Sequence, residues 1–124
     1  MANEIEISAR MAFSKSSRSS NTDDMNALGL TFTMSGTDYV KGTQTIGTTA
    51  EVLGKGEITT PGYLFIKNLD GTNYIELEKA SFSTTAGTVK LKAGEVALFR
   101  VASSTIYACA NTAACDVSYL LIED

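Results

Sequence analysis

Hydrophobic and polar side chains alternate strictly over residues 4–13, where the apolar positions run from Ile5 to Phe13. A period of two is typical of a β-strand with one buried face. The alternation returns over residues 28–35 and ends at the turn signal Ser35-Gly36-Thr37-Asp38. These two patterns predict two half-buried strands.

The segment between them, residues 14–24, contains no apolar side chain and is rich in serine. This composition predicts a polar loop or an extended arm, either exposed to solvent or laid on a neighbouring molecule. Residues 40–58 carry four glycines between β-branched residues, which disfavours a helix. We expect short strands with bends there, with a single helical turn near Thr49–Leu53 as the alternative.

Two apolar runs flank Asp70-Gly71, a dipeptide that favours a type I′ hairpin turn. The predicted register pairs Leu69 with Thr72, and the resulting core face consists of Leu64, Ile66, Ile75 and Leu77. The opposite face would be aromatic and charged together. Such a face is typical of a surface covered by another subunit. We therefore predict an interface formed by Tyr63, Phe65, Lys67, Tyr74 and Glu76.

The rest of the chain predicts further strands, joined first by a type II turn at Lys92-Ala93-Gly94-Glu95. The last two strands are expected at Thr105–Ala110 and Asp116–Ile122. The total is about eight strands without a convincing helix. This pattern predicts an all-β fold, an antiparallel β-sandwich or small jelly-roll-like barrel, with residues 1–124 forming a single domain.

Charge and composition restrict the function further. The net charge of −4 and the scattered basic residues argue against binding of nucleic acid or of an anionic membrane surface. The chain contains no histidine, which removes Ser-His-Asp catalysis and imidazole metal sites. We expect no enzymatic activity, no cofactor and no metal site.

The other residues that could act in catalysis or binding also have structural interpretations. Cys109 and Cys115 match no zinc spacing and are either reduced thiols or a disulfide across a terminal hairpin. Glu76 with Glu78 could form a catalytic carboxylate pair, although a solvated or interface rim explains them better. Asp23-Asp24 could touch a cation. The tyrosines could stack on sugars, but core and interface packing is the favoured interpretation.

Three segments carry a resemblance. They are GTQTIGTTAEVLGKGEITTPGYLFIKNLDGTNYIEL, LKAGEVALFR and IYACANTAACDVSYLLIED. Over residues 40–124 the chain resembles small structural proteins of tailed-bacteriophage virions. The resemblance implies a non-enzymatic virion component that forms a homo-oligomer, expected to be cyclic, such as a trimer.

The function expected on this basis is capsid decoration or cementing, with the major capsid protein or another virion protein as the partner. A capsid location is favoured over the tail because the chain has no shaft-like repeat. The alternative is a tail-tip or fibre module that binds a host surface glycan through exposed tyrosines.

Overall fold

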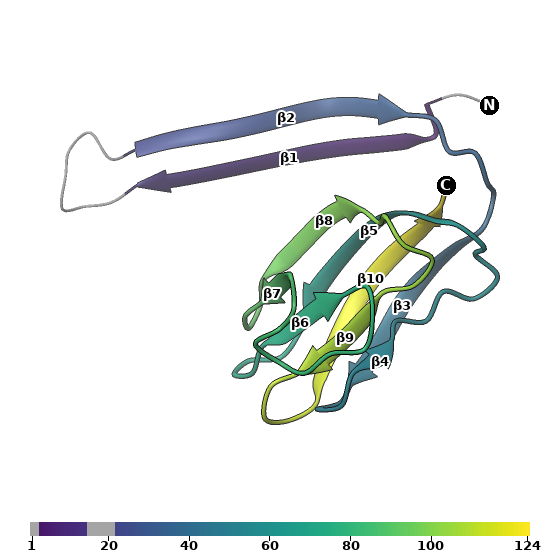
Figure 1. Cartoon of the computed structure of the whole chain (residues 1–124). Coiled ribbons are helices and arrows are strands. Elements are labelled where there is room, and N and C mark those ends of the chain that lie inside the picture. Colours follow the sequence, from purple (N-terminus) through teal and green to yellow (C-terminus); the bar gives the residue numbers. More distant parts are fainter. Residues whose placement is uncertain (1–2, 15–21) are drawn as a thin grey trace. The chain divides into compact units, whose positions relative to one another are not determined.

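The computed structural model describes residues 3–14 and 22–124, which fold into ten β-strands without a helix among the described residues (Figure 1). Every strand pairing is antiparallel. The all-β fold class predicted from the sequence is therefore confirmed. The chain divides into two compact units, residues 1–34 and residues 35–124.

The first unit is a hairpin of two long strands, β1 (Ile5–Ser14) and β2 (Thr22–Phe32). Ile5 pairs with Phe32 at one end and Ser14 with Thr22 at the other. The predicted polar arm therefore lies partly in strands, because Ser14 ends β1 and residues 22–24 begin β2. Residues 15–21 of that arm lie outside the described residues.

A β-bulge interrupts the ladder of this hairpin between the Ile7–Leu30 and Ala9–Ala27 pairs. One residue of β1 separates these pairs, but two residues of β2 do. Gly29 lies there with a φ of +67°, which glycine adopts without steric cost, and its N–H donates to Ser8 Oγ at 2.8 Å. The extra residue shifts the alternation of β2 by one position.

The second unit is a sandwich of two four-stranded sheets. One sheet has the order β3-β10-β5-β8 and comprises β3 (Tyr39–Ile46), β10 (Cys115–Glu123), β5 (Pro61–Asn68) and β8 (Val96–Arg100). The other has the order β4-β9-β6-β7 and comprises β4 (Glu51–Val52), β9 (Tyr107–Ala110), β6 (Ile75–Glu78) and β7 (Val89–Leu91). Apart from the β6–β7 hairpin, every connection crosses from one sheet to the other, which gives the strand order of an eight-stranded jelly roll.

The predicted hairpin around Asp70-Gly71 is wrong, because β5 and β6 belong to different sheets. The Asp70 carboxylate accepts hydrogen bonds from the N–H groups of Thr72 and Asn73, at 2.9 and 2.6 Å. This local turn leads the chain across the sandwich instead of back along β5. The β7–β8 and β9–β10 connections also cross between the sheets, so the predicted terminal hairpin is wrong for the same topological reason.

The core lies between the two sheets and contains the four residues predicted for it, Leu64, Ile66, Ile75 and Leu77, each no more than 1% exposed. Leu64 and Ile66 come from one sheet and Ile75 from the other, so they meet across the sandwich instead of lying side by side. Burial of each such side chain contributes about 1.5–3 kcal/mol.

Other local predictions are correct. Gly94 has a φ of +79° and Glu95 N–H donates to Lys92 O at 3.0 Å, as the predicted turn requires. Residues 49–53 contain the short strand β4 and no helical turn. The sequence predicts one sandwich domain over residues 1–124; in the structure the sandwich is built from residues 35–124, and residues 1–34 form a separate compact unit.

Candidate interaction surfaces

The outer face of the β3-β10-β5-β8 sheet carries three of the predicted interface residues. Tyr63, Phe65 and Lys67 alternate along β5 with the buried residues of that strand, so they point away from the core. Phe65 is 47% exposed and lies in register between Leu120 of β10 and Leu98 of β8. An apolar stripe therefore crosses three neighbouring strands of this face, and we call it the Phe65 stripe.

Charged residues flank the Phe65 stripe. Lys41 pairs with Leu120 from the edge strand β3, and Lys67 lies two positions from Phe65 along β5. Both lysines are exposed. An apolar centre with a polar rim is the usual composition of a protein–protein interface.

One end of this face is held by an ion pair. Arg100 Nη1 lies 2.9 Å from Asp124 Oδ1, and the hydrogen bond to Asp124 raises the pKa of Arg100. The guanidinium also lies 4.6 Å from the centroid of the Tyr63 ring. Tyr63 is thus packed under a cation at the end of the stripe.

The other two predicted interface residues, Tyr74 and Glu76, lie on the other sheet, so the expectation of one shared face is wrong. Tyr74 precedes β6, and Lys90 Nζ lies 4.0 Å from the centroid of its ring. Glu76 is only 4% exposed, and its carboxylate accepts hydrogen bonds from Thr85 N–H and Gly87 N–H at 2.8 and 2.9 Å. The Glu76 carboxylate therefore fixes the 79–88 segment inside the subunit, whereas an interface role for Tyr63, Phe65 and Lys67 stays a prediction.

The 79–88 segment also covers Cys109, which pairs with Glu76 across β9 and β6 and is 1% exposed. Burial raises the pKa of the Cys109 thiol, and its Sγ lies 3.3 Å from Thr48 O. Cys115 is fully buried in the core between the sheets, and burial raises its pKa too. Both cysteines are free thiols on strands of different sheets. They behave as small buried side chains, which was one of the two predicted states.

The carboxylates considered for catalysis are engaged within the chain. Glu78 accepts hydrogen bonds from Thr88 Oγ1 and Lys79 N–H, at 2.6 and 2.8 Å, and these bonds lower its pKa. A lowered pKa is the reverse of what a general acid needs. Asp24 forms an ion pair with Arg10 at 3.2 Å. Within residues 3–14 and 22–124 no group of three acidic or sulfur side chains converges as a metal site would require.

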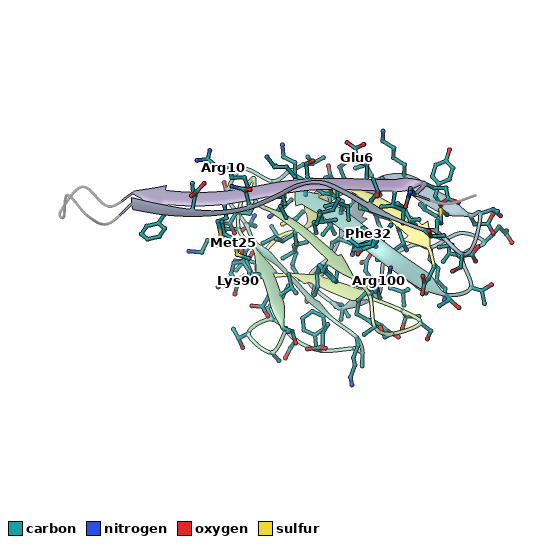
Figure 2. All side chains as sticks on the ribbon, turned by 90° about the horizontal axis from the view of Figure 1, so that it is seen from above. Glu6, Arg10, Met25, Phe32, Lys90 and Arg100 are labelled. Atoms are coloured by element: carbon teal, nitrogen blue, oxygen red, sulfur yellow. The ribbon has the colours of Figure 1, made fainter. Side chains whose placement is uncertain are left out.

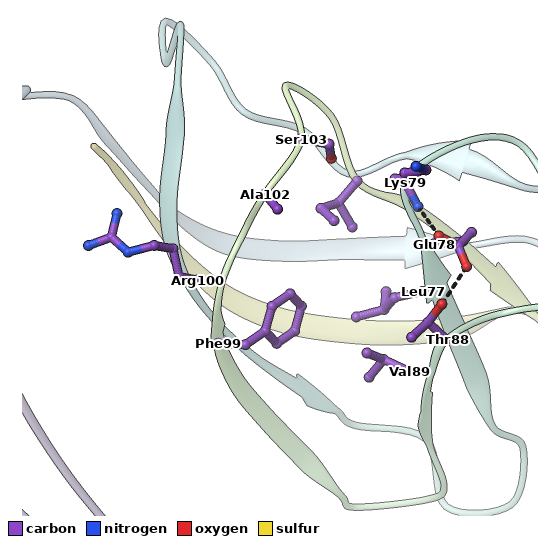
Figure 3. Close-up of a pocket in the computed structure, with 10 residues that line it drawn as sticks. Leu77, Glu78, Lys79, Thr88, Val89, Phe99, Arg100, Ala102 and Ser103 are labelled. Carbon is purple, nitrogen blue, oxygen red and sulfur yellow. Dashed lines mark hydrogen bonds between the residues drawn. The ribbon is translucent and has the colours of Figure 1, made fainter.

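A cleft of about 340 Å³ opens between β6 and β7 of one sheet and β8 of the other (Figure 3). Its floor is apolar and consists of Leu77, Val89, Phe99 and Ile106. At its rim, Glu78 is bonded to Thr88, Ser103 Oγ donates to Thr105 O, and Arg100 points away from the cleft (Figure 3). The cleft has the volume of a small-molecule site, but its lining is mainly apolar.

The β1–β2 hairpin has one continuous apolar face, of which the sequence pattern predicted the β1 part and the end of β2. Successive cross-strand pairs on this face are Ile5–Phe32, Ile7–Leu30, Ala9–Ala27 and Met11–Met25, followed by Phe13. Arg10 and Asn26 pair on the opposite, polar face, and Arg10 and Met25 project from opposite sides of the ribbon (Figure 2). Met11 and Met25 are 76% and 77% exposed and Phe13 is 59% exposed. We call this set the apolar ribbon face.

The described residues contain no helix that is long and apolar enough to cross a membrane. No known protein family, no curated protein and no solved structure matches this chain, so the assignment of its function depends on the surfaces described above.

Proposed function

We propose that this chain is a non-enzymatic structural protein of a tailed-bacteriophage virion, and that it acts as a capsid decoration or cement protein. The Phe65 stripe supports this proposal more than any other observation. An exposed phenylalanine lies in register between two leucines, on a sheet face that also carries exposed lysines. An exposed apolar surface of this kind suits docking on another folded protein better than turnover of a small substrate.

The resemblance of residues 40–124 to small phage structural proteins supports the virion assignment. The jelly-roll strand order is one that viral capsid domains use, although many other proteins use it as well. In the described residues, the buried Glu76 and the partly exposed Glu78 are bonded to the chain itself. These two carboxylates thus stabilise the fold, whereas the exposed apolar surfaces are free to contact a partner.

Cementing also needs little affinity per contact. A standard interface buries about 1,600 Å² in total, and one face of a small domain can supply half of that. Because a capsid presents many equivalent sites, bound copies that also contact one another gain avidity without any new chemistry. We place the protein on the capsid because the chain carries no shaft-like repeat.

The test is co-sedimentation of the purified chain with phage heads that lack it. We expect the wild-type chain to sediment with the heads and Phe65→Asp to lose at least about tenfold in affinity, since it buries a charge at the interface centre. Thr43→Asp is the matched control, because Thr43 lies on the edge strand β3, is exposed and does not belong to the Phe65 stripe.

Two results would contradict the proposal. One is that mass spectrometry of purified particles finds no copy of the chain. The other is that Phe65→Asp sediments with heads as well as the wild type does.

One observation favours the alternative, a tail module that binds a glycan. Tyr39 is 66% exposed and pairs with Ile122, and Tyr63 lies at the same end of the sheet on the next strand but one. Two strand spacings put these rings roughly 10 Å apart, which suits stacking on a sugar. A glycan array separates the two functions: binding that Tyr39→Ala abolishes would favour the alternative, and the decoration proposal expects no binding.

A further inference from the structure

The apolar ribbon face is the largest set of exposed hydrophobic side chains in the first unit. Four of its residues, Met11, Phe13, Met25 and Leu30, are between 42% and 77% exposed. A two-stranded ribbon by itself is marginally stable at best in water. A ribbon with one apolar face is therefore expected to be covered in the working protein.

We propose that the apolar ribbon face is a self-association surface, and that its occupant is the apolar ribbon face of a second copy of this chain. The inference deepens the proposed function, because it names the contact through which cementing copies would bind one another. Its physical basis does not depend on that function.

The chemistry of the face selects an apolar partner. No described side chain on the face from Ile5–Phe32 to Met11–Met25 is charged. Arg10 and Asp24, which are joined by an ion pair, lie on the other side of the ribbon. A charged or strongly polar partner would leave its own groups unpaired against this face.

The area fits a pair of ribbons. At about 200 Å² for a fully exposed side chain of this size, the four exposed residues present roughly 500 Å² per copy. Two copies facing each other would bury roughly 1,000 Å² from these side chains alone, which is the lower limit of a specific interface.

The shape of the face is complementary to itself. The bulky Met11–Met25 pair lies beside the small Ala9–Ala27 pair on the same face. A hollow of about 260 Å³ opens between the 9–11 and 25–27 segments. When two ribbons pack with opposite directions around a two-fold axis, the methionines of each copy can enter the hollow of the other. Methionine suits this role because its unbranched side chain adapts to irregular space.

The test compares two substitutions at neighbouring positions with opposite orientation. Met25→Asp places a carboxylate in the centre of the apolar ribbon face, and Asn26→Asp places one on the polar face beside Arg10. In sedimentation equilibrium we expect the wild type and Asn26→Asp to show a mass of at least twice 13.2 kDa at micromolar concentration. Met25→Asp should raise the dissociation constant about 100-fold or more, because the carboxylate must be desolvated on association.

Cross-linking covers the case in which Met25→Asp fails to fold. Met25→Cys treated with a short bismaleimide should give a covalent dimer much faster than Asn26→Cys does, since the native thiols Cys109 and Cys115 are buried. A monomeric wild type, or equal cross-linking of the two cysteine variants, would overturn the inference. A ribbon whose apolar face is covered by its own chain would also leave the wild type monomeric. A monomer that still binds phage heads would leave the proposed function intact, whereas an oligomer that does not bind them would refute the proposed function alone.

Discussion

Replacing Asn68 with alanine removes the side chain that joins two of the connections crossing between the sheets. Asn68 ends β5 and is fully buried. Its Nδ2 donates to Asn73 O in the β5–β6 connection, at 3.0 Å, and to Leu91 O at the end of β7, at 3.1 Å, with Lys92 O at 3.3 Å. Its Oδ1 accepts from Asp70 N–H at 3.0 Å. One side chain thus fixes the position of both sheet-crossing loops.

The magnitude follows from these bonds. Each intramolecular hydrogen bond contributes about 1 kcal/mol net, and a buried acceptor left without a donor costs about 1–3 kcal/mol. With two donor hydrogens and one acceptor lost, Asn68→Ala should lower the free energy of unfolding by about 3–5 kcal/mol. A unit of 90 residues has roughly 5–13 kcal/mol in total, so the loss would be a large part of its stability.

Urea unfolding followed by far-ultraviolet circular dichroism measures this loss, since the chain contains no tryptophan to report on folding. With a slope of about 2 kcal/mol per molar urea, the midpoint should fall by roughly 1.5–2.5 M. Asn73→Ala is the control, because the hydrogen bond that Thr112 Oγ1 donates to Asn73 Oδ1, at 2.8 Å, is exposed to solvent. A loss below about 1 kcal/mol for Asn68→Ala, with an unchanged slope, would refute the assignment of Asn68 as the link between the loops.

Three further predictions concern stability. Thr85 has a φ of +81°, which strains a β-branched residue. Thr85→Gly should therefore raise the free energy of unfolding by about 1 kcal/mol in the same urea assay. An equal or lower stability would contradict this. A Cβ at Gly87 would lie 2.7 Å from Glu76 Cβ and 3.1 Å from Leu77 O, so Gly87→Ala should cost about 1–3 kcal/mol, and no loss would mean that the 79–88 segment is not fixed on the sheet. The folded pKa values of Glu78 and Glu123 lie below their ordinary 4.5 because backbone N–H groups and Thr88 bond to these carboxylates. Their contribution to stability is present above pH 4.5 and is lost as the pH falls through the folded pKa values, so the thermal midpoint should fall below that pH. The thermal midpoint of Glu123→Gln should fall less steeply with decreasing pH than that of the wild type. An unchanged dependence of the midpoint on pH below 4.5 would show that Glu123 does not contribute.

The sequence predicts the strands and the core well, because both depend on local alternation. A period of two tells which side chains of a strand point to the same side, and Leu64 and Ile66 are buried as that rule requires. The turn at Gly94 was predictable for a similar reason, since a positive φ is a local demand that glycine meets.

The alternation does not tell which sheet a strand joins. Ile66 and Ile75 would be buried equally in a hairpin and across a sandwich, so hydrophobicity cannot separate the two arrangements. The distinction depends on Asn68, whose buried amide bonds to segments up to 24 residues away. The predicted interface failed as one surface for this reason: Phe65 and Glu76 share a face in a hairpin but lie on different sheets in a jelly roll.

In the apolar ribbon face, the bulge at Gly29 interrupts the period-two alternation from which a strand is predicted. In β2 the apolar positions are Met25 and Ala27 and then Leu28, Leu30 and Phe32, so the phase changes from odd to even. A strict period of two breaks at this change, which is why the strand was predicted to begin only at residue 28. The bulge at Gly29 restores the phase by adding one residue opposite β1, so that both halves of β2 lie against the same face of β1. A bulge that aligns nine apolar side chains on one face, four of them largely exposed, costs ladder hydrogen bonds, and a hairpin that needed only to be soluble would gain nothing from it. Covering by another protein surface gives that alignment a physical reason.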